Sequence, residues 1–590
     1  MKRRQFILKA GLAAGGLLTL PSCISSRAGA RAIRWTRSGS VFTSVACDGQ
    51  PLVASPSLLT AKCHLEGEAT SQGPLRVSLE HQLRDSGSGF GEDTLEAVLT
   101  IHNPSDRSLR VHLEFATAAN PSPRLAEQRV YVPLSAAGLG GDKRFAALGV
   151  KEFLKDCNQA VGASDFAAHY LEPMASQPTE KETRALLLAP VLDVFEPQRP
   201  WRVALFTPSD QPMRFSHRSG VWRVGRQITV AAGGAFKQRC WLMIHRGDAS
   251  VAWKAFHRFA HREDHPPIGW TREFKVHYYD FLSSADEKSG RRGDGYERDL
   301  PNFCEFRVGM ATQHGYYPSL GDYIHPDRKT WQAMRGDKQG PAEMSFEKMR
   351  ARIRATRAAG AKAAIYLHPV LFDDATPFFN RMRDSVLVDD QGQMVRFPWS
   401  GPDTVDKNWR ASIASPQWRE HLLQQAEWIM DILKPDAICV DETFAGLGYD
   451  YHPDHAGPMS LPAIDWHRKL RALVRSHGSD KAVFTSDCSD SSFVFWADGE
   501  VGDHAYPTLL GHPLYTQEPV RYLAALGDKP WRPCAWHFQK MWKLQMALAC
   551  QVGAGVGVSN GWLEYTGLAD LPASLRAAML ADITTLFDKP

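Results

Sequence analysis

The sequence predicts a multidomain protein of the α/β plus β class, in which an N-terminal β-sandwich precedes a (β/α)8 TIM barrel. Three observations favour this fold. At 590 residues, the chain is too long for one ordinary hydrophobic core. Residues from about 33 to 250 are rich in short runs that partly alternate apolar and polar residues, whereas residues 265–590 alternate short apolar runs with amphipathic helical stretches. We therefore expect a signal segment at 1–32, a sandwich domain at 33–264 and a barrel domain at 265–590.

The first 32 residues have the pattern of an export signal. Arg3 and Arg4 form a pair of the twin-arginine type, and an apolar run follows at 10–20. Residues 20–23, Leu-Pro-Ser-Cys, resemble a bacterial lipobox with Cys23 as the lipidated residue. The apolar run is shorter than the roughly 20 residues of a membrane-spanning helix. We expect an exported protein of the periplasm or cell envelope, anchored by a lipid at Cys23. An ordinary cleaved signal peptide and a membrane anchor are the alternatives.

The composition narrows the possible partners. Charged residues make up 23% and hydrophobic ones 43% of the chain, as in a soluble globular protein. The net charge is only +4, and no block of Lys and Arg lies beyond the N-terminus, so nucleic acid is not an expected partner. The cysteines contain no C-x-x-C, and we expect no metal and no cofactor. Cys47 and Cys63 are candidates for a disulfide in an oxidising compartment.

The sandwich domain is predicted from its alternating runs. Residues 95–101 and 109–115 partly alternate, and the turn cluster Asn103-Pro104-Ser105-Asp106 lies between them, which predicts a hairpin. Similar runs recur at 221–224 and 240–244. A short helix around residues 251–259 and a Pro-rich linker at 265–269 then end the domain.

The barrel domain is predicted from eight short apolar runs separated by amphipathic helices. A helix at 345–359 stops at Gly360, and a second helix is capped by Ser415 with Pro416 in its first turn. A third helix ends near Gly478. A doubly wound open sheet is the alternative, but no G-x-G-x-x-G follows a strand. The expected strands are 274–279, 306–310, 363–367, 437–440, 482–485, 501–506, 534–537 and 554–558.

Polar side chains gather at the carboxyl ends of these strands. All the strand ends of a parallel barrel meet at one mouth, where catalytic groups lie. A solvated loop surface is the alternative for each residue taken alone. We expect the substrate-binding residues to be Asp280, His314, His368, His504, His537, Trp562 and Glu564, with Asn560 in the same group.

Carboxylates at two neighbouring strand ends predict the chemistry. Asp441 ends the run Ile438-Cys439-Val440, and Asp487 ends a similar run on the next strand. Glycoside cleavage needs two carboxyl groups, of which one attacks or stabilises the anomeric carbon and the other transfers protons. Asp441 is the expected nucleophile and Glu442 its competitor, because adjacent strand residues point in opposite directions. Asp487 is the first choice for the acid/base and Asp503 the second. Asp498 is a further choice if no helix follows Asp487.

These motifs resemble those of a known family. A β-rich domain before a barrel, with Val440-Asp441 closing the fourth strand and Ser486-Asp487 the fifth, is similar to retaining α-galactosidase-type and endo-α-N-acetylgalactosaminidase-type glycosidases. The resemblance covers roughly residues 40–590 and implies an oligo- or polysaccharide substrate with α-linked galactose-like sugars. The chain departs from the pattern in having Asp487 where the family often has Glu, and in the expected absence of a C-terminal β-domain.

Other functions remain open at this point. A metal-dependent barrel hydrolase ordinarily has closely spaced His ligands, yet the sequence has no H-x-H and no H-E-x-x-H. A non-catalytic carbohydrate-binding lipoprotein would keep an aromatic cleft and lose its acids, whereas Asp441 and Asp487 are present. A polysaccharide lyase or a cofactor-dependent oxidoreductase is also possible, although no cofactor motif occurs.

Overall fold

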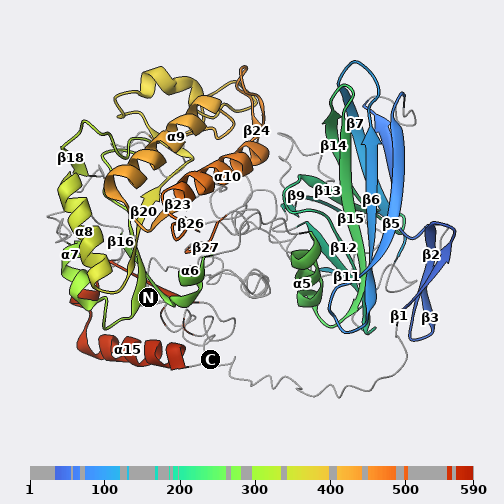
Figure 1. Cartoon of the computed structure of the whole chain (residues 1–590), viewed down its shortest axis with the longest axis horizontal. Helices are drawn as coiled ribbons and strands as arrows, with labels where there is room; N and C mark the ends of the chain where they lie inside the picture. The colour runs from blue at the N-terminus through green and yellow to red at the C-terminus, as the bar shows by residue number, and fades with distance from the viewer. Residues whose placement is uncertain are drawn as a thin grey trace, which may run out of the picture.

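The computed structural model of the chain has a β-rich N-terminal part and an α/β C-terminal part, which lie side by side along the long axis of the molecule (Figure 1). Helix α5 (Ala249–Phe259) ends the β-rich part and lies on its side toward the second part. The structure describes residues 33–54, 57–66, 73–119, 129–131, 166–170, 185–186, 190–196, 198–260, 268–280, 295–333, 342–396, 408–441, 449–486, 497–501, 542, 546, 555–560 and 567–588.

Two six-stranded sheets make up most of the N-terminal part. One has the order β10-β9-β13-β14-β7-β4 and the other the order β5-β6-β15-β12-β11-β8. The two sheets bury one common core, which includes Leu95 and Leu99 from β6 and Leu113 and Phe115 from β7. The three-stranded sheet β1-β2-β3 completes this part. The strands are β1 (Ile33–Ser38), β2 (Val41–Cys47), β3 (Gln50–Ala54), β4 (Thr60–Leu65), β5 (Arg76–Asp85), β6 (Glu92–His102), β7 (Leu109–Thr117), β8 (Arg129–Tyr131), β9 (Phe166–Tyr170), β10 (Ala185–Leu186), β11 (Val191–Phe195), β12 (Trp201–Phe206), β13 (Met213–Arg218), β14 (Val221–Val230) and β15 (Ala235–Arg246).

The predicted hairpin between residues 95–101 and 109–115 is wrong. β6 pairs with β5 and β15, whereas β7 pairs with β14 and β4, so the two strands belong to different sheets. The turn between them carries the chain from one sheet to the other. Asn103 fixes this crossing, because its Nδ2 donates to the carbonyl oxygens of Arg107 at 2.8 Å and Val230 at 3.1 Å. Alternation of apolar residues shows which face of a strand is buried, but not which strand is its partner.

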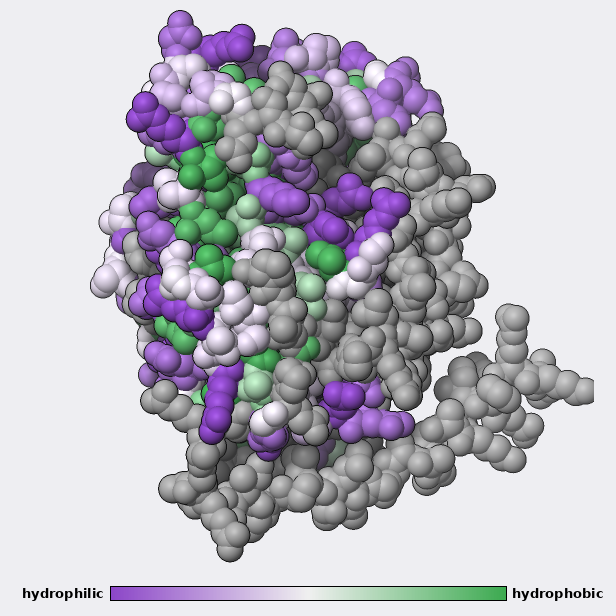
Figure 2. Space-filling model, turned by 90° about the vertical axis from the view of Figure 1, so that its right-hand side faces the viewer, coloured by the Kyte–Doolittle hydropathy of each residue, from purple (hydrophilic) through white to green (hydrophobic). Residues whose placement is uncertain are grey.

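The outer side of the N-terminal part mixes polar and apolar residues. Figure 2 shows this side, where hydrophobic residues gather in a band between hydrophilic ones. The edge strand β5 lies on this side in Figure 1, and its half-buried Val77 and Leu79 alternate with exposed Arg76, Ser78 and Glu80. Charged residues along an edge strand disfavour its pairing with another chain.

A parallel sheet of seven described strands organises the C-terminal part. Its order is β27-β26-β23-β20-β17-β16-β28, so the last described strand lies beside the first. Every neighbouring pair is parallel. The strands are β16 (Val276–Asp280), β17 (Val308–Gln313), β20 (Lys362–Leu367), β23 (Ala437–Asp441), β26 (Ala482–Ser486), β27 (Gly499–Glu500) and β28 (Val556–Ser559).

Most of the predicted strands coincide with these elements. The predicted run 501–506 is described only at Val501, which directly follows β27, and the run 534–537 lies outside the described residues. The matching runs are 274–279 with β16, 306–310 with β17, 363–367 with β20, 437–440 with β23, 482–485 with β26 and 554–558 with β28.

The helices form where their caps predict. Ser345 accepts a hydrogen bond from the backbone of Lys348 at the start of α8 (Phe346–Ala358), and Gly360 follows that helix with a φ of 86°. Ser415 accepts from the backbone of Trp418 at the start of α9 (Pro416–Trp428). Helix α9 continues as the π-helical turn η4 (Ile429–Leu433), and α10 (Ser460–Ser476) follows β23 in the chain.

Shorter elements complete the described part. They are α6 (Gly269–Glu273), α7 (Gly295–Asp299), η2 (Leu300–Asn302), β18 (Thr330–Ala333), β19 (Ala342–Ser345), β21 (Leu371–Asp373), η3 (Phe379–Ser385), β22 (Asn408–Arg410), β24 (Tyr449–Asp450), β25 (Gly457–Pro458), η5 (Leu568–Asp570) and α15 (Ala573–Asp588).

The described residues bear on a membrane-spanning helix and on the candidate disulfide. None of their helices has the length and apolar character needed to cross a membrane. Cys47 and Cys63 are both free and buried, so the candidate disulfide is not formed. Burial raises the pKa of the Cys47 thiol to about 12, which keeps it protonated.

The two parts of the chain touch at described residues. Ile464 of α10 belongs to the buried core of the N-terminal sheets. Arg468, one turn further along α10, places its Nη2 3.4 Å from Oδ2 of Asp210. Helix α10 therefore packs on the parallel sheet with one side and meets the N-terminal part with another.

Candidate active site

The parallel strands bring Asp280, His314, His368, Asp441 and Asn560 to one edge of the sheet. Asp280 and Asp441 are the last residues of β16 and β23. His314, His368 and Asn560 directly follow β17, β20 and β28. All five are buried. The described part of the predicted mouth thus carries five buried polar residues at the strand ends.

Asp441 lies on the inner face of the sheet. Ile438 and Val440 of the same strand pack in a core that contains side chains of α8, α9 and α10. Successive residues of a strand point to opposite faces. Asp441 therefore shares the opposite face with Cys439, which belongs to a small cluster formed by residues of the parallel strands and Phe274. The side chain of Asp441 therefore points away from the face that α8, α9 and α10 cover.

Tyr366 holds the Asp441 carboxylate. Its hydroxyl donates a 2.6 Å hydrogen bond to Oδ2 of Asp441. Tyr366 comes from β20, the neighbour of β23, where it is level with Cys439. Burial, followed by the nearby charge of Asp441, raises the pKa of Tyr366 well above its usual value. The hydroxyl therefore remains a hydrogen-bond donor at any physiological pH.

Aromatic rings surround this pair. The His314 ring meets the Tyr366 ring edge-on at 3.9 Å between centroids, and Tyr317 stacks on Tyr366 at 5.8 Å. Burial, followed by the neighbouring His368, lowers the pKa of His314 to about 3. His314 is therefore neutral at neutral pH and packs against Tyr366 as an uncharged ring.

Two more tyrosines fix the backbone that carries Tyr366. The hydroxyl of Tyr316 donates to the carbonyl oxygen of Tyr366 at 3.1 Å. The hydroxyl of Tyr323 donates to the carbonyl oxygen of His368 at 2.9 Å and accepts from the His368 N–H at 2.8 Å. The segment that follows β17 thus fixes the end of β20 at the backbone of both Tyr366 and His368, and this holds Tyr366 in position.

Asp280 has a different environment. It is fully buried, with Nη1 of Arg352 3.8 Å from its Oδ2, and Nδ2 of Asn560 donates to its Oδ1. Tyr278, two residues earlier in β16, donates to the buried Asp299 at 2.8 Å. Asp280 lies on the same face of β16 as Tyr278, which packs against α7. Through its contacts with Asn560 and Arg352, Asp280 links β16 to β28 and α8. Its contact with a sugar hydroxyl stays a prediction.

Asp498 does not lie at the mouth. It comes directly before β27, at the amino end of the sheet, and accepts from Arg471 at 2.8 Å and Arg475 at 2.6 Å. It also accepts from the backbone N–H of Val483 at 2.9 Å. The alternative that placed Asp498 at a strand end as the acid/base is therefore wrong, because its carboxylate holds two helix arginines against the opposite edge.

The described residues contain one group of possible metal ligands, namely Glu427, Asp431 and His477. It lies at the end of α10, on the opposite edge of the sheet from Asp441. The remaining predicted site residues lie outside the described part of the chain. They are Glu442, Asp487, Asp503, His504, His537, Trp562, Glu564 and the lipidation residue Cys23.

Tyr366 and Tyr323 are site residues that the sequence reasoning missed. The sequence predicts that Tyr366 lies within a strand, but it points only to His368, the residue after that strand, as part of the mouth. The signal was the strand alternation itself. Tyr366 lies two residues before His368 on a strand next to β23, and its side chain therefore shares the face of Asp441.

The fold is that of the α-galactosidase-like glycoside hydrolases. The alpha-galactosidase of Lactobacillus brevis matches 94% of this chain and 69% of its own, with a TM-score of 0.54 and 10% identity. A variant of the GH36 alpha-galactosidase AgaA from Geobacillus stearothermophilus, in complex with raffinose, matches 90% of this chain and 73% of its own, with a TM-score of 0.53 and 8% identity. Another variant of that enzyme, in complex with stachyose, has the same TM-score and identity and is covered over 75% of its length.

At these identities the likeness is one of fold. No protein-family model and no curated protein sequence matches the chain.

Proposed function

We propose that the protein is an exported glycoside hydrolase with Asp441 as its nucleophile. One observation carries the proposal: Asp441 ends a parallel strand on the inner face of the sheet, with its carboxylate held by Tyr366. We further propose that the sheet closes as a (β/α)8 barrel. The adjacency of β28 and β16 supports this closure, since the last strand of a barrel pairs with the first.

The mechanism follows from this placement. The hydrogen bond from Tyr366 to Oδ2 orients the carboxylate for attack on the anomeric carbon through Oδ1. A bond forms between Oδ1 and that carbon as the glycosidic C–O bond breaks, while a second carboxyl group gives its proton to the leaving oxygen. The same group then takes a proton from water, which displaces Asp441 and releases the sugar with retained configuration.

Asp487 and Asp503 are the candidates for the second carboxyl group. Asp487 directly follows Ser486, the last residue of β26, and Asp503 comes three residues after Glu500, the last residue of β27. β26 is the neighbour of β23, which favours Asp487. Glu442, directly after Asp441, is the competing nucleophile.

The proposed substrate is an oligosaccharide with an α-linked galactose-like sugar. The alpha-galactosidases of the same fold, two of them in complex with raffinose and stachyose, support this class. The proposed location is the cell envelope, through the twin-arginine segment and a lipid at Cys23. A Cys23→Ser variant expressed in a bacterial host should leave the membrane fraction and stay in the soluble exported fraction.

The decisive experiment is the Asp441→Asn variant on an aryl α-galactoside. We expect hydrolysis to fall by several orders of magnitude, with an unchanged circular dichroism spectrum. Added azide should restore release of the aryl group in the smaller Asp441→Ala variant, because a small anion can occupy the space that the missing carboxylate leaves. Activity equal to that of the parent would move the nucleophile elsewhere. Saccharide binding without turnover in both proteins would indicate a carbohydrate-binding protein.

The same assay separates the acid/base candidates. Removing the acid/base slows the cleavage of substrates with poor leaving groups far more than of those with good ones, since only the former need a proton. We expect this pattern for Asp487→Ala and not for Asp503→Ala. The reverse result would assign the role to Asp503.

A further inference from the structure

The hairpin of β24 and β25 lies at the edge of the sheet that carries Asp441. Tyr449 is level with Pro458 and Asp450 with Gly457 in this hairpin. Helix α10 begins directly after it at Ser460 and returns the chain toward the start of β26. A helix that joins two parallel strands begins at their carboxyl edge. The hairpin is therefore part of the rim of the candidate active site.

Two tyrosines of this hairpin form an exposed aromatic pair. The ring centroids of Tyr449 and Tyr451 lie 4.6 Å apart, with 50° between the ring planes. Tyr449 is 36% exposed, and Tyr451 is half-buried. Among the residues that the structure describes, Tyr449 and Leu461 are the large apolar side chains that remain exposed.

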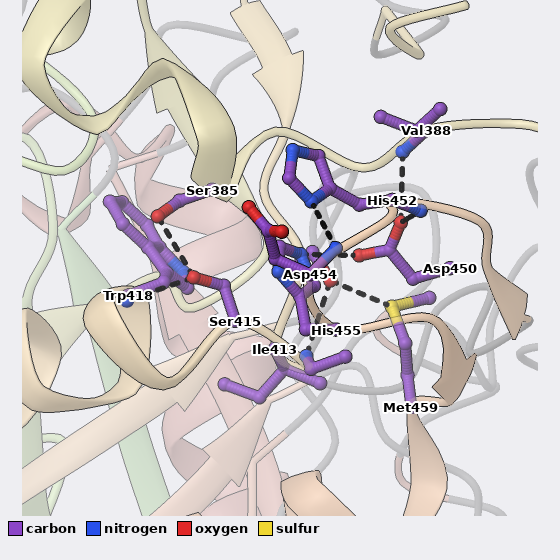
Figure 3. A network of polar contacts seen from close by, with 12 residues as sticks. Ser385, Val388, Ile413, Ser415, Trp418, Asp450, His452, Asp454, His455 and Met459 are labelled. Carbon is purple, nitrogen blue, oxygen red and sulfur yellow. Dashed lines mark hydrogen bonds and ion pairs between the residues drawn. The ribbon is translucent and has the colours of Figure 1, made fainter. Parts of the chain in front are cut away.

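Buried polar contacts of Asp450 hold the hairpin that carries the pair (Figure 3). Asp450, between the two tyrosines, is fully buried and accepts from the N–H groups of Val388 at 3.2 Å and His452 at 3.0 Å. Its Oδ2 lies 3.0 Å from Nε2 of His455. Because strand residues alternate, the buried Asp450 directs its two neighbours to the other side. The hairpin is thus fixed to the connection between β20 and α9, which includes Val388.

An exposed aromatic face suits a carbohydrate. Sugar rings present C–H groups on their faces, which pack on aromatic rings. A site that is already rigid loses little conformational freedom when it binds.

We propose that Tyr449 and Tyr451 form a binding platform for a leaving-group sugar of the substrate, next to the sugar that Asp441 attacks. This inference rests on the proposed function and deepens it. The substrate class is then an oligosaccharide of at least two sugars, rather than a single sugar on a small aglycone. The platform is a specificity determinant, since it contacts a part of the substrate that does not react.

The test compares two substrates in the Tyr449→Ala variant. Raffinose carries leaving-group sugars, whereas α-galactosyl fluoride carries none. We expect kcat/KM for raffinose to fall about three- to tenfold through a higher KM, as for the loss of one aromatic contact, and kcat/KM for the fluoride to stay unchanged. Tyr449→Phe should keep the parent's values for both. Leu461→Ala, which removes the other exposed apolar side chain, is the matched control and should also behave as the parent.

Other outcomes have distinct meanings. Equal losses on both substrates, or no loss on either, would overturn the platform while leaving the hydrolase intact. If the parent cleaves neither substrate, the proposed function fails, and titration calorimetry of the parent and Tyr449→Ala with stachyose decides the platform separately. Weaker binding in the variant would support it as a saccharide site, and equal binding or no binding would overturn it.

Discussion

The hydroxyl of Tyr366 lies 2.6 Å from Oδ2 of Asp441, although the two residues are 75 positions apart in the sequence. The contact joins adjacent parallel strands at the edge where their side chains converge. Tyr316 holds the backbone of Tyr366 in turn, so the hydrogen bond to Asp441 is supported by a second one behind it. We interpret Tyr366 as a positioning residue for the proposed nucleophile.

The first prediction concerns this contact. Tyr366→Phe removes the hydroxyl and keeps the ring. A hydrogen bond to a charged group contributes about 1.5–3 kcal/mol, which corresponds to roughly a 10- to 100-fold effect. We expect kcat for an aryl α-galactoside to fall by that factor with little change in KM, since the contact orients the reacting carboxylate rather than the sugar.

A matched variant separates this effect from general destabilisation. The hydroxyl of Tyr296 bonds Oγ1 of Thr356 at 2.5 Å, in the buried core beside α7 and α8. Tyr296→Phe should lower the melting temperature to a similar degree and leave kcat unchanged. If Tyr366→Phe lowers kcat no more than Tyr296→Phe does, the positioning role is wrong.

The second prediction concerns Asp498. Its carboxylate is fully buried between Arg471 and Arg475. Removing one partner from a buried ion pair costs about 3–5 kcal/mol, because the remaining charges stay buried. We expect Asp498→Asn to lower the urea midpoint strongly and to keep kcat per folded molecule. Loss of kcat at full stability would restore Asp498 as a catalytic candidate.

Much of the C-terminal fold could be predicted because its signals are local. An apolar run of β length, a capping serine such as Ser415 and a terminal glycine such as Gly360 each describe one element with its boundaries. The order of strands in a parallel sheet then follows from the chain. The crossing at Asn103 could not be predicted, because its turn residues fit a hairpin and a sheet-to-sheet connection equally well.

The residues of the candidate site also differ in how far local sequence signals predict them. Asp441 could be predicted from its position at a strand end. For Tyr366, strand alternation indicates the face but not the role, since that role depends on a side chain of the neighbouring strand, and an apolar strand containing one tyrosine looks like ordinary core. For Asp280, a position at the end of a strand does not place the side chain on the face of Asp441. It also ends a strand, but strand alternation places it on the face that packs against α7 and α8, beside Arg352.

The third prediction concerns close packing at a bulge. The pairing of β16 with β17 shifts register beside Gly309, and a Cβ at this position would lie 2.1 Å from Cβ of Phe274. Gly309→Ala should therefore destabilise the protein by about 1–3 kcal/mol, as overpacking does. Gly269→Ala is the control, because the nearest atom to its new Cβ would be 4.0 Å away. Equal melting temperatures for the two variants would contradict the prediction.

The fourth prediction concerns the dependence of stability on pH. Burial raises the pKa of Asp299 to about 6. Hydrogen bonds from the backbone of Ala569 and from Tyr278 lower this pKa, but burial is the larger effect. The folded protein therefore binds this proton more tightly than the unfolded chain, whose aspartates titrate near pH 4. The resulting stabilisation is complete below that pH and is lost as the pH rises through about 6.

Asp299→Asn tests this sign, because an amide does not ionise. Between pH 4 and pH 7 the melting temperature of the parent should fall relative to that of the variant, by the equivalent of at most about 3 kcal/mol. Asp465→Asn is the control, because Asp465 lies on the exposed side of α10, where it pairs with Lys469 at 2.8 Å. Its melting temperature should change with pH as that of the parent does. A parent that gains stability over Asp299→Asn across this range would show that Asp299 is held in its charged form, and that the hydrogen bonds from Ala569 and Tyr278 outweigh its burial.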